Sequence, residues 1–85
     1  MDALTEEALF RRALEGNEQQ LGAHHSNTLT SVNKLALLLY KLGRLTESET
    51  LFRRALEGLE QQLGAHHPST LISMNNLAGL LQAQG

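Results

Sequence analysis

Two histidine pairs are the side chains in this sequence that most suggest metal chemistry. His24-His25 and His66-His67 stand 42 residues apart, and neutral imidazole is a common zinc ligand. Adjacent side chains seldom point at one ion, however, and the sequence has no cysteine and no carboxylate close to either pair to complete a ligand set. We therefore predict no bound metal or cofactor, and we expect the second histidine of each pair to pack or to cap a helix at a turn.

Two arginine pairs raise the question of nucleic-acid binding. In both Arg11-Arg12 and Arg53-Arg54, a glutamate stands four residues before the first arginine, in the order that favours ion pairs along a helix. No aromatic residues alternate with the arginines to stack on bases, and the formal net charge of the chain is −2. We therefore assign the arginines to helix ion pairs and predict no nucleic-acid partner.

The remaining residues give little support for catalysis or for membrane insertion. The sequence has no glycine-rich phosphate loop and no nucleophile elbow. Its longest apolar run, residues 35–40, is much shorter than the roughly 20 residues that cross a bilayer, and no basic segment followed by an apolar one opens the chain. Apolar residues, mainly Leu and Ala, make up 41% of the 85 residues, which favours a small helical domain. We expect a cytoplasmic protein that is neither an enzyme nor a membrane protein.

The sequence repeats itself. Residues 7–43 align with residues 49–85 without a gap, and 26 of the 37 positions are identical. The eight letters of residues 9–16 return unchanged at residues 51–58. Such repetition is typical of a protein that stacks copies of one structural unit.

Four helices joined by short turns account for nearly the whole repeat. Apolar residues recur at spacings of three and four, which predicts helices at about residues 2–21, 28–42, 46–63 and 69–84. Ser26 or Asn27 is suited to cap the second helix, and Pro68 to stand in the first turn of the last. Thr46 and Glu49 have the spacing of a capping box for the third. The first three predicted helices end at glycines, namely Gly22, Gly43 and Gly64.

The residues around the end of the second predicted helix form the most specific pattern in the chain. Its members are Leu35, Ala36, Leu39, Gly43, Leu45, Phe52 and Ala55. In this pattern the chain resembles a tetratricopeptide repeat, whose signature places small residues where two helices cross. Residues 51–56, 63–68 and 73–78 look more specifically like the 42-residue repeats of kinesin light chains and related bacterial and nephrocystin-type proteins. The resemblance implies an all-α fragment of an α-solenoid, built from antiparallel helix-turn-helix repeats, that binds other proteins.

The resemblance also implies which helix of a repeat each segment forms. The order is B, A, B, A over a single domain of residues 1–85, with one complete repeat at residues 28–63. Phe52 and Ala55 lie in the only B helix flanked by two A helices, so we expect them to be the best-buried residues. The first and last helices each expose an apolar stripe, which favours association. We therefore expect a homo-oligomer, formed either by head-to-tail contacts in a ring or filament or by a swapped dimer.

A peptide-binding surface follows from the same resemblance. In tetratricopeptide arrays the outward positions of the A helices meet a bound peptide; here these are Thr30, Asn33, Leu37, Tyr40, Lys41, Ile72, Asn75, Gly79 and Gln82. Asn33 and Asn75 are equivalent across the repeat, and an amide side chain offers both donor and acceptor to a peptide backbone. Lys34 replaces the second Asn of the motif in the first copy. Two functions stay open: a scaffold that binds an extended peptide, and a self-assembly module with no ligand of its own.

Overall fold

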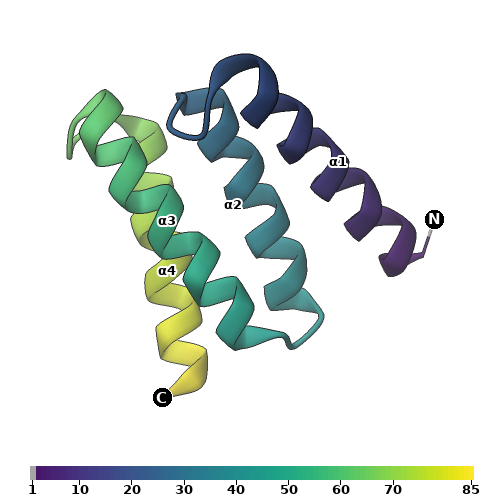
Figure 1. Ribbon diagram of the computed structural model, residues 1–85. Coiled ribbons are helices and arrows are strands. Elements are labelled where there is room, and N and C mark those ends of the chain that lie inside the picture. The colour runs from purple at the N-terminus through teal and green to yellow at the C-terminus, as the bar shows by residue number, and fades with distance from the viewer. Residues whose placement is uncertain (1) are drawn as a thin grey trace.

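Four antiparallel helices make up the computed structural model, which describes residues 2–85 (Figure 1). They are α1 (Ala3–Leu21), α2 (Ser26–Lys41), α3 (Leu45–Leu63) and α4 (Pro68–Gln84). Helix α2 lies between α1 and α3 and packs against each of the other three helices, while α4 packs against α3 and α2. The predicted all-α helix-turn-helix fold is therefore confirmed.

The two histidine turns are built alike. Gly22 and Gly64 end α1 and α3 with φ values of 90° and 91°, in a region that glycine enters at little cost. His25 and His67 then form the caps of the following helices: the Nδ1 atom of His25 accepts from the Asn27 N–H at 3.0 Å, and that of His67 accepts from the Ser69 N–H at 3.1 Å. The expected capping role of the second histidine is confirmed.

The start of two helices differs from the prediction. Helix α2 begins at Ser26, because His25 already supplies the cap, so neither Ser26 nor Asn27 acts as the capping residue. Helix α3 begins at Leu45 after Arg44, which makes no capping hydrogen bond through its side chain. The predicted capping box of Thr46 and Glu49 is wrong, because Leu45 packs against the core and Thr46 therefore lies inside the helix. Pro68 occupies the first turn of α4, as expected.

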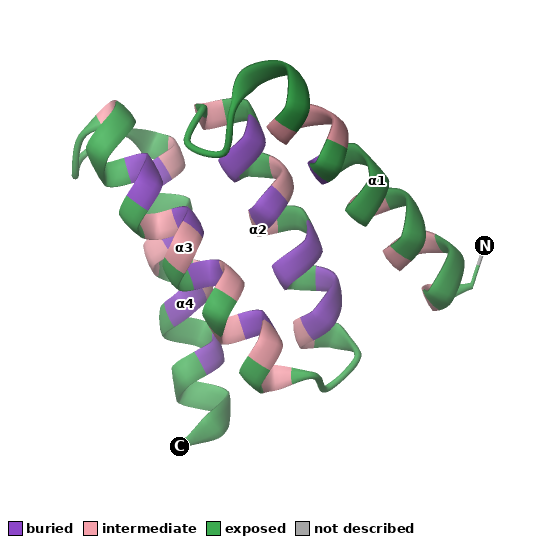
Figure 2. Cartoon of the chain, in the orientation of Figure 1, coloured by how far each residue is buried: buried purple, intermediate pink, exposed green. Residues whose placement is uncertain are grey.

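Buried residues are concentrated on α2 and α3 (Figure 2). One cluster of buried residues consists of Leu14, Val32, Leu35, Leu39 and Ala55, and another of Ala36, Phe52, Leu77 and Leu80. Phe52 is 1% exposed and Ala55 is fully buried, which confirms the expectation for this helix, although several leucines are buried as deeply. Their counterparts in α1 are less covered: Phe10 is half-buried and Ala13 is exposed.

Small residues stand where α2 crosses α3. A Cβ atom added to Gly58 would lie 2.5 Å from Cδ1 of Leu29, so the bare glycine lets that side chain sit on the helix. Ser48 is also fully buried, and its Oγ donates to the carbonyl of Ala36 at 2.6 Å. The close approach of the two helices therefore depends on the absence of larger side chains at both positions.

Candidate functional site

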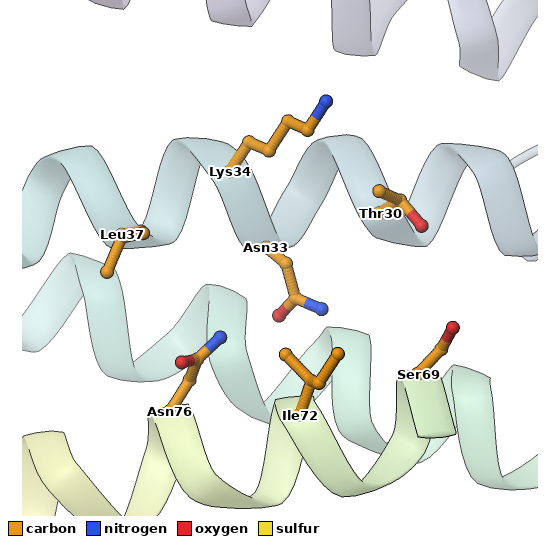
Figure 3. Close-up of a pocket in the computed structure, with 7 residues that line it drawn as sticks. All are labelled: Thr30, Asn33, Lys34, Leu37, Ser69, Ile72 and Asn76. Carbon is orange, nitrogen blue, oxygen red and sulfur yellow. The ribbon is translucent and has the colours of Figure 1, made fainter. Parts of the chain in front are cut away.

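A pocket of about 250 Å³ lies between α2 and α4 (Figure 3). Its lining combines apolar, amide, hydroxyl and ammonium groups: Thr30, Asn33, Lys34, Leu37, Ser69, Ile72 and Asn76. In Figure 3, Asn33 points from α2 toward α4, while Ile72 and Asn76 point from α4 toward α2. Ile72 is 58% exposed and Leu37 is 39% exposed, so much of the apolar surface here faces solvent.

Two smaller pockets adjoin the first. One of about 160 Å³ lies between α1 and α2 and is lined by Glu6, Phe10, Lys34, Leu37, Leu38 and Lys41. Another of about 160 Å³ is lined by Leu37, Tyr40, Phe52, Asn75, Asn76, Gly79 and Leu80. Because Leu37 lines all three pockets, they lie next to one another along α2. We refer to these three pockets together as the groove.

The structure brings together most of the predicted peptide-binding residues. Thr30, Asn33, Leu37 and Ile72 line the largest pocket; Tyr40, Asn75 and Gly79 line a second pocket; Lys41 lines the third. Gln82 is exposed in the last turn of α4 and is not among the residues that line these three pockets.

The two equivalent asparagines have different surroundings. The Oγ atom of the fully buried Ser73 donates to Oδ1 of Asn33 at 3.0 Å, which fixes the orientation of this amide on the α4 side of α2. Asn75 is exposed on α4. Asn33 is thus a pre-oriented amide, whose Nδ2 carries two donors, whereas Asn75 is open to solvent.

Sequence reasoning missed three residues of the largest pocket, namely Lys34, Ser69 and Asn76. Lys34 and Asn76 are equivalent across the repeat, and each directly follows one of the predicted asparagines. The second Asn position of the repeat motif could therefore have identified both Lys34 and Asn76 as pocket residues. Ser69 lies in the first turn of α4 and lines the pocket from that helix (Figure 3).

A ring of four charged side chains ties α1 to the start of α3. Arg11 contacts Glu7 at 2.9 Å and Glu47 at 2.6 Å, and Arg44 contacts the same two carboxylates at 2.6 and 2.7 Å. Hydrogen bonds from Arg11 and then Arg44 hold the pKa of both Glu7 and Glu47 below its usual value. The same pairing raises the pKa of both guanidinium groups. These arginines thus serve in ion pairs within the chain.

Two further arginines, Arg53 and Arg54, also pair with carboxylates. Arg53 contacts Glu49 at 3.0 Å along α3, as the four-residue spacing predicts. Arg54 reaches from α3 to Glu18 of α1 at 2.7 Å. In residues 2–85, no three His, Cys, Asp or Glu side chains gather closely enough to hold a metal ion. None of the four helices described above has the length and apolarity that a membrane span requires.

The family model for the tetratricopeptide repeat matches residues 7–61 and, in a second overlapping placement, residues 27–85. The chain belongs to the tetratricopeptide repeat family. Repeats of this family generally mediate protein–protein interaction. Both A helices of this tetratricopeptide chain, α2 and α4, line the groove, and side chains of α1 and α3 complete it. A comparison with curated proteins gave no match.

Proposed function

We propose that this tetratricopeptide chain binds an extended peptide in the groove, which includes the pocket between α2 and α4. The observation that carries the proposal is the exposure of Ile72 and Leu37 in a pocket that also presents amide side chains. Covering an apolar side chain fully gains about 1.5–3 kcal/mol. Because each of these two is about half exposed, a ligand that covers both would gain about 2 kcal/mol, or roughly 30-fold in affinity.

The amides give the groove a way to recognise the peptide backbone. Asn33 points from α2 and Asn76 from α4 toward the space between the two helices (Figure 3), and each carries both a donor and an acceptor group. An extended peptide offers the same two groups along its main chain. We further propose that these repeats are of the 42-residue kinesin-light-chain type, since the repeat length and the stretches at residues 51–56, 63–68 and 73–78 support it.

Titration of fluorescently labelled extended peptides of acidic and of aromatic composition would test the groove. We expect Asn76→Ala and Ile72→Ser each to weaken binding by about 5- to 10-fold, because each removes a hydrogen-bonding group or part of the apolar floor. Gln61→Ala, an exposed position on α3, is the matched control and should leave affinity unchanged. Peptide binding that ignores both groove substitutions would refute the proposed site.

Self-association through α1 and α4 is a second candidate function. It is favoured by apolar residues that these two helices expose: Leu4 at 79%, Leu9 at 45%, Leu71 at 43% and Leu81 at 39%. Exposed apolar surface of this kind promotes contacts with another chain. Light scattering from micromolar to millimolar concentration would measure the association directly, and a constant monomer mass would argue against it.

A further inference from the structure

The residues that join α2 to α3 have counterparts on the open faces of α4 and α1. Helix α4 repeats α2, and α3 repeats α1, at an offset of 42 residues. Within the chain, Leu29 of α2 is fully buried against Gly58 of α3. Its counterpart Leu71 is 43% exposed, and a Cβ built on Gly16, the counterpart of Gly58, would meet no atom within 4 Å. The leucine and the bare glycine that would receive it are therefore both open, on opposite faces of the molecule.

An ion pair between the B helices, α1 and α3, also has its counterpart residues on the two open faces. Arg54 of α3 binds Glu18 of α1 at 2.7 Å. One repeat away, the counterparts are Arg12 on α1 and Glu60 on α3, and both are exposed. The α1 face thus presents a cation, and the α4 face, to which the end of α3 belongs, presents the matching anion.

A hydrogen bond between the A helices, α2 and α4, likewise has counterpart residues one repeat away. Ser73 donates to Asn33 within the chain, and the counterparts are Ser31 on α2 and the exposed Asn75 on α4. Nδ2 of Asn17 donates to Oγ of Ser31 at 2.6 Å. The Ser31 hydroxyl proton is then available to a further acceptor.

We propose that two copies of this chain associate head to tail, with α1 of the second copy lying on α4 of the first in the register that α3 adopts on α2. The inference rests on the self-association proposed above and specifies its geometry. Leu71 of the first copy then lies on Gly16 of the second, and Glu60 pairs with Arg12 of the second copy. Because the two faces differ, the contact is heterologous and each added copy leaves a further open face.

The association in this register extends the groove. The counterpart of the largest pocket is formed at the junction by Ile72, Asn75 and Asn76 of the first copy, with Thr30 and Lys34 of the second. Neither copy supplies this pocket alone. Stacked copies therefore offer a longer continuous surface to an extended peptide than a single copy does.

Two departures from the repeat make the junction weaker than the internal contact. Within the chain the Ser48 hydroxyl donates to the Ala36 carbonyl. At the junction the counterparts are Glu6 of the second copy and Ala78 of the first, so a carboxylate replaces the hydroxyl donor. Asn17 stands at the position of Leu59, which is 1% exposed. Association is accordingly reversible, and Glu6→Ser should strengthen it by at least threefold, because a donor is restored to a buried carbonyl.

Two variants that each block one face test the register. Gly16→Arg places a large side chain on α1 where Leu71 of another copy would lie, and it leaves α4 unchanged. Leu71→Asp places a charge on the apolar face of α4, and it leaves α1 unchanged. Each variant alone should remain monomeric in light scattering and sedimentation velocity at concentrations at which the unmodified chain associates. An equal mixture should form a 1:1 dimer and nothing larger, because only one pair of faces remains compatible.

The outcomes separate the register from self-association itself. An unmodified chain that stays monomeric up to millimolar concentration overturns both. If the unmodified chain associates but either variant still associates alone, the register is overturned and self-association stands. The same holds if the unmodified chain associates but the mixture of variants stays monomeric. Circular dichroism confirms that the variants are folded. If Leu71→Asp fails to fold, the surface pair decides: Arg12→Glu and Glu60→Arg should each weaken association by about 3- to 5-fold, the doubly reversed chain should regain it, and equal behaviour of all three overturns the register.

Discussion

A single methyl group added at Gly16 and at Gly58 is expected to move stability in opposite directions. The two glycines occupy the same position of an identical eight-residue stretch, residues 9–16 and 51–58. Both lie inside helices, so replacement by Ala gains about 0.5–1 kcal/mol of helix propensity at either site. Any difference between the two variants therefore arises from what the new methyl group contacts.

At Gly58 the methyl group has no room. It would lie 2.5 Å from Cδ1 and 2.9 Å from Cδ2 of Leu29, against ordinary contacts of 3.4–4 Å. Leu29 is fully buried, so it has no open space into which to retreat. Overpacking of this kind costs about 1–3 kcal/mol, which exceeds the propensity gain and leaves Gly58→Ala destabilised by about 1 kcal/mol. At Gly16 the space is open, and the full propensity gain remains.

Chemical denaturation followed by circular dichroism, at micromolar concentration to limit association, measures both free energies of unfolding. The two variants should differ by about 1–3 kcal/mol, the overpacking alone. Leu29→Val supplies the control, because a shorter side chain should reduce the cost of Gly58→Ala and leave that of Gly16→Ala unchanged. If Gly58→Ala stabilises the chain as much as Gly16→Ala does, the close packing of Leu29 on α3 is wrong.

The remaining predictions concern a cap and the ring of charges. His67→Ala should lower the free energy of unfolding by about 1 kcal/mol, because it removes the acceptor for the Ser69 N–H, whereas His67→Asn keeps an acceptor and should lower it less. Thermal denaturation measures both variants, with His66→Ala at the neighbouring exposed position as the control. Equal losses of stability in all three variants would contradict the cap. Glu7 and Glu47 have lowered pKa values in the folded chain, so their stabilisation is complete above the unfolded value of about 4.3 and is lost as pH falls through the lower folded value. Glu7→Gln should therefore flatten the acid side of the stability–pH curve, and an unchanged curve would show that the ring does not couple to folding.

Local sequence predicted the helices well because their signals are local. Apolar spacing, the stop at Gly22 and the suitability of Pro68 each depend on a few neighbouring residues, and all three are found in the structure. The start of α3 was predicted incorrectly because contacts distant in sequence decide it. Leu45 packs into the core with Phe52 and Leu80, and Arg44 pairs with Glu7 across 37 residues. The spacing of Thr46 and Glu49 is a local pattern and holds no information about either of these distant contacts.

The groove was predictable in outline but not in its details. The resemblance to the tetratricopeptide repeat assigned outward positions of α2 and α4, and the structure gathers eight of the nine predicted residues around the three pockets. The pattern treated Asn33 and Asn75 alike. In the fold, Ser73 orients Asn33, while Asn75 has no following A helix in the described structure to supply the same serine. Such differences arise from what lies beside each copy, which an internal repeat does not encode.

Identical residues in this chain differ in burial because their neighbours differ. Ala55 is fully buried whereas Ala13 is exposed, and Gly58 receives a leucine whereas Gly16 receives none. The proposed register therefore makes Gly16→Ala act twice. It should raise the stability of the dilute monomer, and it should weaken association because the same methyl group would meet Leu71 of another copy as it would meet Leu29 at Gly58. A face with no docking role would show the first effect without the second.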